Sequence, residues 1–317
     1  MISLSYTVTS LLQDHLKTID TLRRSILLTP LSPSREQKLL WQASIDRIYG
    51  TLILSGSHVT KKLIAETLMS PKKRPSPEES TIATAKNVLD FIRNEWTGNS
   101  KSITQGSIEE LATHLFPKDR VRVARTIETK TRDIHQVLAY LEVKPDHPIL
   151  MAATLHYAFL VDPLLPWDNG RLGRAVCGIF LAKYGYNVRG MIAPEAVVAE
   201  SKETYQRSLE AAQRDTTITS WLEYYSKILM TALERLADAT QVEKETSDVS
   251  RRLFSLSDRQ NALLSLLENP TTTITNRVVQ KRFKVSQITA SRDLAKLSSL
   301  GLLYPHGKGR SVYYTRV

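Results

Sequence analysis

The residues best suited to chemistry lie in the segment His156–Arg174, HYAFLVDPLLPWDNGRLGR. Within it, Asn169-Gly170-Arg171 is expected to open a helix after a proline-containing loop. The free N–H groups at a helix start bind anions, and a glycine there lets a phosphate approach closely. Arg171 and Arg174 are three residues apart, on one face of the first turns. The pattern therefore predicts a phosphate site made of Asn169, Gly170, Arg171 and Arg174. The alternative is a tight turn with two solvated arginines.

This segment resembles the signature of the Fic (Fido) family, HPFx(D/E)GNGRxxR, which stands at the start of an α-helix. The stretch HPILMAATLHYAF at 147–159 looks like the helix before that signature, and residues 201–229 resemble the family's downstream helices. The resemblance extends over residues 36–317. It implies a Fic fold, and an activity that transfers AMP from ATP to a protein hydroxyl. In the family the signature His is the base, the acidic residue holds Mg²⁺, and the NGRxxR part holds the phosphates.

The match fails at the catalytic position. Aligned without gaps, the His position falls on Pro163, the acidic position on Trp167 and the first glycine on Asp168. With compensating one-residue shifts, Asp162 replaces the His and Asp168 approximates the Mg²⁺ ligand. Neither alignment supplies a histidine, and loss of a general base costs about 10²–10⁴-fold in rate. Asp162 is thus a weak candidate base and Asp168 a weak candidate metal ligand, while His156 is expected to be buried and hydrogen-bonded.

A second departure concerns the motif (S/T)xxxE(G/N), whose Glu pairs with the last signature Arg and blocks the nucleotide in many Fic proteins. Its counterpart here is Thr51–Gly56, TLILSG, with Ser55 at the Glu position. We therefore expect Arg174 to lack that acidic partner. A protein that cannot transfer AMP does not need this restraint.

Positive charge is concentrated near the C-terminus. The chain carries 43 Lys and Arg against 32 Asp and Glu, a net charge of +11. Residues 251–317 hold 12 Lys or Arg against 3 Asp or Glu, whereas residues 1–250 hold 31 against 29. Charge gathered in one part of a chain is typical of a module that binds a polyanion. A basic surface without a partner is the alternative.

The elements that position these residues are mostly helical. Apolar spacing predicts a helix on the stripe Leu11 to Leu22, one after Thr60, and others at 36–50, 81–95, 107–116, 128–142, 148–161, 170–184, 195–213 and 217–240. Residues 69–80 are expected to form an exposed loop. By the same resemblance, 117–130 would supply the flap that aligns a target polypeptide.

The C-terminal pattern differs. A helix at 257–268, a short one from Thr275, one from Ser286 to Ser299 and then strand, glycine-rich turn and strand predict a winged helix-turn-helix. In the helix after Ser286, Ile288, Ala290, Leu294 and Leu297 are expected to form the apolar face, and Asp293 to be a structural partner. The residues expected to contact DNA are Gln287, Thr289, Ser291, Arg292, Lys296, Lys308 and Arg310.

The predicted fold class is mainly α: a Fic-type helical domain followed by a small α+β winged-helix domain. We divide the chain into an N-terminal helical segment (1–35), a Fic-like domain (36–240), a linker (241–256) and the winged helix (257–317).

Cys177 is the only cysteine, which excludes an intramolecular disulfide and a Cys-based zinc site. The first residues lack a basic stretch followed by an apolar run, so no signal peptide is expected, and no apolar run is expected to span a membrane. A cytoplasmic location is therefore expected.

Three functions remain open at this point. The favoured one is a catalytically degenerate Fic-fold regulator that binds DNA, as a homodimer on paired half-sites, and senses ATP with Mg²⁺ or another phosphorylated ligand. The second is an active AMP transferase that uses Asp162 as an altered base. The third is an inert Fic scaffold for protein–protein interaction.

Overall fold

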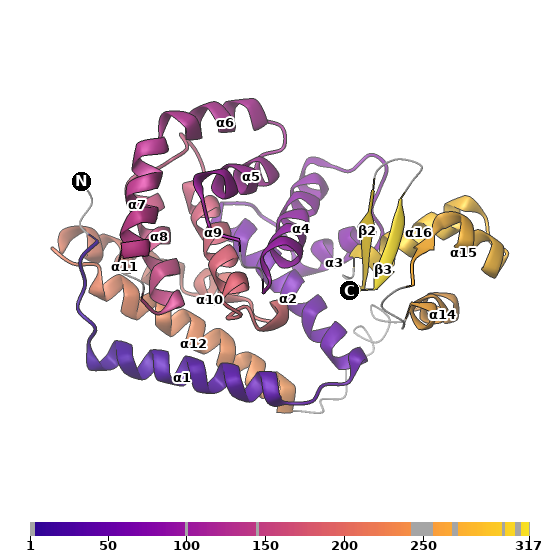
Figure 1. Ribbon diagram of the computed structural model, residues 1–317, viewed down its shortest axis with the longest axis horizontal. Helices are drawn as coiled ribbons and strands as arrows, with labels where there is room; N and C mark the ends of the chain where they lie inside the picture. Colours follow the sequence, from indigo (N-terminus) through magenta and orange to yellow (C-terminus); the bar gives the residue numbers. More distant parts are fainter. Residues whose placement is uncertain are drawn as a thin grey trace.

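The computed structural model describes residues 4–98, 101–143, 146–241, 256–267, 272–299, 302–307 and 312–316. The helical part contains α1 (Ser10–Leu28), α2 (Pro33–Leu54), α3 (Lys61–Met69), α4 (Pro77–Trp96), α5 (Gln105–Leu115), α6 (Arg120–Thr129), α7 (Thr131–Val143), α8 (Pro148–Val161), α9 (Asn169–Lys183), the 3₁₀ turn η1 (Val188–Gly190), α10 (Pro194–Glu200), α11 (Lys202–Arg214) and α12 (Thr219–Gln241). The C-terminal part contains α14 (Asp258–Leu266), β1 (Ile274–Thr275), α15 (Asn276–Phe283), α16 (Gln287–Ser299), β2 (Leu303–His306) and β3 (Tyr313–Arg316). Figure 1 shows the two parts side by side, with the C-terminal elements at one end of the molecule.

The core of the helical part is built around α8 and α9. Helix α8 carries apolar residues on all its faces and is almost wholly buried, because α9 and α12 pack against it. Gly173 allows the close approach of α9, since a Cβ there would lie 2.5 Å from Cδ2 of His156. From α12, the indole of Trp221 donates a hydrogen bond of 2.8 Å to the carbonyl of Ala153. The start of α9 is therefore held by a rigid, fully packed support.

Helix α1 belongs to the same core. It lies alongside α12 (Figure 1), and Nδ1 of His15 is 2.9 Å from the hydroxyl of Ser226. Leu12, Ile19 and Ile26 are buried there, whereas Leu11, which the apolar stripe assigned to the core, is exposed. Leu11 is adjacent to the buried Leu12 and therefore points to another side of the helix. Its assignment to the apolar stripe was wrong.

Some predicted helix bounds were also wrong. Residues 117–130 contain α6, which sequence spacing missed because this amphipathic helix is rich in arginine and buries little more than Val123 and Ile127. The predicted helix 195–213 is two helices, α10 and α11. The break occurs at Ser201, whose φ of −130° and ψ of 45° are not helical. The predicted helix 36–50 is longer than expected, since α2 begins at Pro33 behind the N-cap Ser32 and extends to Leu54.

The C-terminal part is a winged helix. Helices α14, α15 and α16 are joined by a three-stranded antiparallel sheet of order β1-β3-β2, in which β1 comes from the chain between α14 and α15, and β2 and β3 follow α16. Leu303 pairs with Arg316, and Ile274 pairs with Tyr314. Thr275 caps α15, as the sequence predicted, and the Ser286 hydroxyl accepts a hydrogen bond from the N–H of Thr289. Residues 308–311, with the predicted DNA contacts Lys308 and Arg310, and most of the predicted linker lie outside the described residues.

The two parts share one apolar cluster. Buried side chains of α2, α3 and α4 continue into those of α14, α15 and α16, and the hydroxyl of Ser299 donates a 3.0 Å hydrogen bond to the carbonyl of Leu68 in α3. The winged helix thus packs on the face of α3. In the described part of the chain, no helix is both long and apolar enough to traverse a bilayer.

Candidate anion site and nucleic-acid interface

The start of α9 has an unusual backbone. Asp168, the N-cap residue, adopts the left-handed conformation with φ 49° and ψ 37°, which normally favours glycine. This agrees with the ungapped alignment, in which Asp168 occupies the first glycine position. The predicted phosphate ligand Asn169 faces backward: its Oδ1 accepts a 2.8 Å hydrogen bond from the N–H of Leu165, and its Nδ2 donates to the carbonyl of the same residue. Asn169 therefore orders the loop before α9.

Arg171 is paired within the chain. Its Nε donates a 2.7 Å hydrogen bond to Oδ2 of Asp168, and its Nη2 forms an ion pair with the same oxygen. Asp168 in turn lies with its Oδ1 3.4 Å from the hydroxyl of Ser55. The carboxylate of Asp168 thus binds the guanidinium of Arg171, which the sequence analysis predicted to bind a phosphate. Because this carboxylate is already engaged in the ion pair, it does not fit the role of a Mg²⁺ ligand.

Arg174 has a different environment. Only 8% of it is exposed, its Nη2 donates to the hydroxyl of Ser55 at 3.2 Å and to the carbonyl of Thr51 at 3.4 Å, and its Nε has no hydrogen-bond partner. Among the described residues no carboxylate is within ion-pair distance of it. Burial lowers the pKa of the guanidinium. Ser55 thus stands beside Arg174, at the place where the restraining Glu was expected, and offers a neutral hydroxyl.

The space around Arg174 is small. It lines two hollows, one of about 30 Å³ next to Thr51 and Arg171, the other of about 20 Å³ next to His156 and Tyr205. One water needs about 10–15 Å³ by such a measure, whereas small-molecule pockets span about 300–1,000 Å³. A nucleotide would enter only if the side chains around Asp168 moved.

The predicted weak base Asp162 ends α8 and lies at the surface. Its Oδ1 is 3.8 Å from Nζ of Lys130, the residue that ends α6. Trp167, which takes the acidic position in the ungapped alignment, packs edge-on against Phe116 and lies under the guanidinium of Arg122, 4.1 Å from the ring centre. The indole thus fills the space between this loop and α6.

His156 is remote from solvent. It is 2% exposed, its Nε2 lies 3.3 Å from the hydroxyl of Tyr205, and its ring packs edge-on against Trp221 and Tyr225. Burial lowers its pKa to about 3, and the positive charge of Arg174 acts in the same direction. A histidine held neutral inside the core does not reach a substrate hydroxyl. The described residues contain no group of three or more His, Cys, Asp and Glu that could hold a metal ion.

In the winged helix, Gln287, Ser291 and Arg292 are exposed on α16. The Ser291 hydroxyl accepts a 2.8 Å hydrogen bond from Nδ2 of Asn276, at the start of α15. Two other predicted contacts, Thr289 and Lys296, are half-buried.

Asp293 is buried and structural. It receives hydrogen bonds from Nε of Arg259 at 2.5 Å and Nε2 of Gln260 at 2.7 Å, both in α14. The expected apolar face was wrong at Ile288, which is 64% exposed. Ile288 lies in the first turn of α16, on a side that no described element covers.

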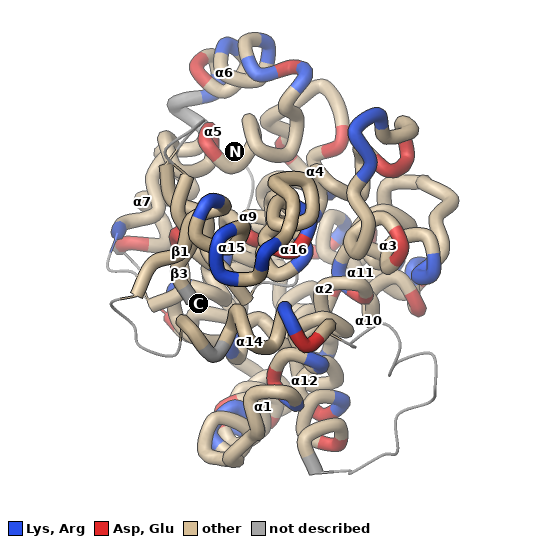
Figure 2. The backbone as a smooth tube through the Cα atoms, turned by 90° about the vertical axis from the view of Figure 1, so that its right-hand side faces the viewer, with Lys and Arg blue, Asp and Glu red and all other residues tan. Residues whose placement is uncertain are grey.

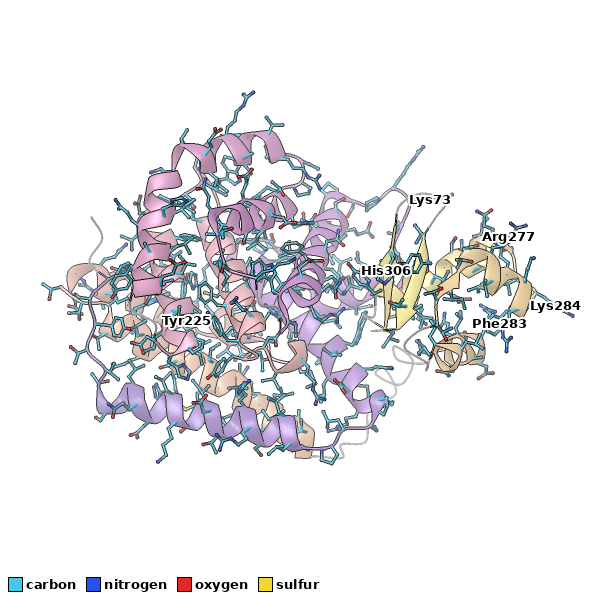
Figure 3. The ribbon with its side chains drawn as sticks, viewed as in Figure 1. Lys73, Tyr225, Arg277, Phe283, Lys284 and His306 are labelled. Atoms are coloured by element: carbon cyan, nitrogen blue, oxygen red, sulfur yellow. The ribbon has the colours of Figure 1, made fainter. Side chains whose placement is uncertain are left out.

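Sequence reasoning assigned no role to four further cations. They are exposed on α15 and the turn after it, and none forms an ion pair within the described part of the chain: Arg277, Lys281, Arg282 and Lys284. Figure 2 shows blue stretches of the backbone tube along α15 and toward α16, and in Figure 3 the side chains of Arg277 and Lys284 point away from the helical part. The run NRVVQKRFK, with four cations and no acid, was the available signal.

Three solved structures share the architecture described above. A Fic family protein from Desulfovibrio desulfuricans G20 aligns over 100% of this chain and 98% of its own, with a TM-score of 0.61 and 15% identity. The chain has the Fic fold. A Fic domain containing signaling protein from Bacteroides thetaiotaomicron VPI-5482 aligns over 73% of this chain and 100% of its own, with a TM-score of 0.58 and 18% identity. Fic-1 (residues 134–508) from C. elegans aligns over 72% of this chain and 71% of its own, with a TM-score of 0.61 and 18% identity.

The C-terminal part has its own match. Residues 259–312 match the DeoR-like helix-turn-helix domain, which confirms the predicted helix-turn-helix. No curated protein matches the chain. The molecule therefore joins a Fic fold to a helix-turn-helix domain, and its fold is mainly α, as predicted from the sequence.

Proposed function

We propose that this chain is a DNA-binding regulator built on a Fic fold that has lost AMP transfer. The observation that carries the proposal is the set of exposed cations on α15 and α16 without acidic partners in the described chain: Arg277, Lys281, Arg282, Lys284 and Arg292. In a helix-turn-helix, one helix crosses the phosphate backbone while the next enters the major groove. Here α15 supplies four cations for the backbone, and α16 presents Gln287, Ser291 and Arg292 to base edges.

The proposal includes a two-fold dimer, because helix-turn-helix proteins commonly read paired half-sites. It also keeps the predicted cytoplasmic location, since the proposed partner is DNA.

Binding of the protein to a duplex of mixed sequence, measured by fluorescence anisotropy over a range of salt concentrations, tests this. Each phosphate contact contributes about 0.9 to the slope of log affinity against log salt. The double substitution Lys281→Ala/Arg282→Ala should lower that slope by about 2 and weaken binding about 30-fold near 0.15 M salt. The matched control is Lys17→Ala/Arg24→Ala on the exposed side of α1. Salt-independent binding, or an equal loss in the control, would contradict the proposal.

The loss of transfer is supported by the same site. His156 is buried, Asp162 faces Lys130, and Asp168 is paired with Arg171. We expect mass spectrometry to find no AMP adduct on the protein after incubation with ATP and Mg²⁺. An adduct lost in an Asp162→Asn variant would favour the transferase reading instead.

A second candidate function, the sensing of a phosphorylated ligand, is favoured by the surroundings of Arg174. A buried guanidinium that meets only neutral oxygens, with Nε unpaired, retains an attraction for an anion. Calorimetric titration with ATP, ADP, GTP and inorganic phosphate, each with and without Mg²⁺, tests it. We expect binding to strengthen in Asp168→Gly, which frees Arg171, and to vanish in Arg174→Met. Absence of binding in both the native protein and Asp168→Gly would leave the Fic fold as a scaffold.

A further inference from the structure

Ile288 stands out on α16. Ala290, Leu294 and Leu297 of this helix are buried and the small Ala295 is exposed, whereas the large side chain of Ile288 is 64% exposed. It is the second residue of the helix, whose start is fixed by the hydrogen bond from the N–H of Thr289 to Ser286. The side chain therefore projects from a well-defined position, on an element held from beneath by the core.

The surroundings of Ile288 are polar and positively charged. Ser291 and Arg292, three and four residues after Ile288, share its helix surface and are exposed, as is the adjacent Gln287. Asn276 of α15 donates hydrogen bonds to the carbonyl of Gln287 at 3.3 Å and to Ser291, which fixes α15 beside this end of α16. Ile288 is thus one large apolar group set among cations and hydrogen-bonding groups.

Charge decides which partner fits this surface. A second copy of the chain seated here would bring Arg277, Lys281 and Arg292 against their own counterparts, and like charges repel. The major groove of DNA has the opposite character: it is strongly anionic along both rims, and the 5-methyl group of thymine is the apolar feature among its base edges. The residues near the N-terminus of a recognition helix are those that reach base edges.

We infer that Ile288 contacts the 5-methyl group of a thymine in the major groove and so determines the sequence preference of α16. This rests on the proposed DNA binding. Gln287 and Arg292 would supply hydrogen bonds on either side, and the methyl contact would add discrimination against cytosine at that position. Removal of one buried methyl group corresponds to about a four-fold loss of affinity.

The test starts from selection of bound duplexes out of a random library by the full-length protein. We expect a thymine at one position of each half-site. Replacement of that thymine by deoxyuridine, which lacks only the methyl group, should weaken binding about four-fold. At the same position, 5-methylcytosine should bind better than cytosine. The Ile288→Ser variant should lose the thymine preference and respond to neither change.

Val121→Ser is the matched control, because Val121 is 67% exposed on α6, outside the winged helix. It should retain the full response to deoxyuridine. Since both side chains are exposed, both variants should unfold at the temperature of the native protein. A circular dichroism melt checks this before binding is compared.

Some results would overturn this inference but leave the proposed DNA binding intact. One is salt-dependent DNA binding whose affinity falls at no deoxyuridine substitution, and another is an undiminished deoxyuridine effect in Ile288→Ser. A selection that enriches no thymine would also overturn it. A lower mass of Ile288→Ser in sedimentation, with the deoxyuridine effect unchanged, would assign Ile288 to a subunit contact. If the native protein binds no duplex at any salt concentration, the proposed function itself fails.

Discussion

The two ends of the molecule use their charged side chains in opposite ways. Near the start of α9, Arg171 is paired with Asp168, and deeper in the domain Nη2 of Arg47 is 2.7 Å from Oε1 of Glu195, with both residues buried. On α15 and α16, the exposed cations meet no acid within the described residues. A phosphate binds where positive charge is uncompensated, so arginine spacing alone does not identify a phosphate site.

Arg174 lies between these two cases. It is as buried as Arg47, yet its hydrogen-bond partners are neutral oxygens: those of Thr51 and Ser55, and the hydroxyl of Tyr205. Burying an unpaired charge is costly, and a compensating acid is the usual solution. The comparison between Arg47, Arg174 and Arg171 can therefore be tested by removing one partner at a time.

The largest effect is expected from Arg47→Met. It leaves the buried carboxylate of Glu195 without its bidentate partner and should lower the free energy of unfolding by about 3–5 kcal/mol. In Arg174→Met, whose new side chain has a similar length, no carboxylate loses an ion-pair partner. The free energy of unfolding should therefore change by about 1 kcal/mol or less. Urea unfolding followed by circular dichroism measures both. Equal losses would mean that Arg174 has an ionic role comparable to that of Arg47.

An intermediate effect on stability is expected from the pH dependence of His156. Burial lowers its pKa from 6.5 to about 3, so below pH 6.5 the unfolded chain binds a proton at His156 that the folded protein does not bind. Between pH 7.5 and 5.5 this should cost about 1.4 kcal/mol of stability, lost as the pH falls below the unfolded pKa. Thermal unfolding across this range should therefore depend less on pH in His156→Gln.

Burial also lowers the pKa of His15 and of His147, so a smaller pH dependence should persist in that variant. His58→Gln, at an exposed position, is the control. An unchanged slope in His156→Gln would show that the buried imidazole does not govern acid sensitivity.

The smallest stability effect is expected from Asp168→Gly. A left-handed conformation costs a non-glycine residue about 1–2 kcal/mol, which glycine would recover, while the ion pair with Arg171 would be lost. The net change in unfolding free energy should be within about 1 kcal/mol. The sharper readout is inorganic phosphate, which should raise the unfolding temperature of this variant more than that of the native protein. No such difference would show that Asp168 does not compete with anions.

Much of the fold was predictable because its signals are local. Helix α8 follows the predicted span 148–161, and the caps at Thr60, Thr275 and Ser286 lie where short-range sequence signals put them. The helix-turn-helix followed from element order and charge. Helix α6 was missed, since a helix with few buried apolar residues gives a weak periodic signal.

The sequence by itself determined which groups are present: no histidine in the signature loop, Ser55 in place of an acid, and a basic C-terminal part. The tertiary structure decided which charges are compensated. The contact of Arg174 with Ser55 joins residues 119 positions apart, and Asp168 reaches Arg171 because the loop before α9 folds into a left-handed turn. Likewise, Ile288 is exposed because no element of the described residues covers it. The contact between Arg174 and Ser55 and the exposure of Ile288 depend on long-range packing, which spacing along the chain does not encode.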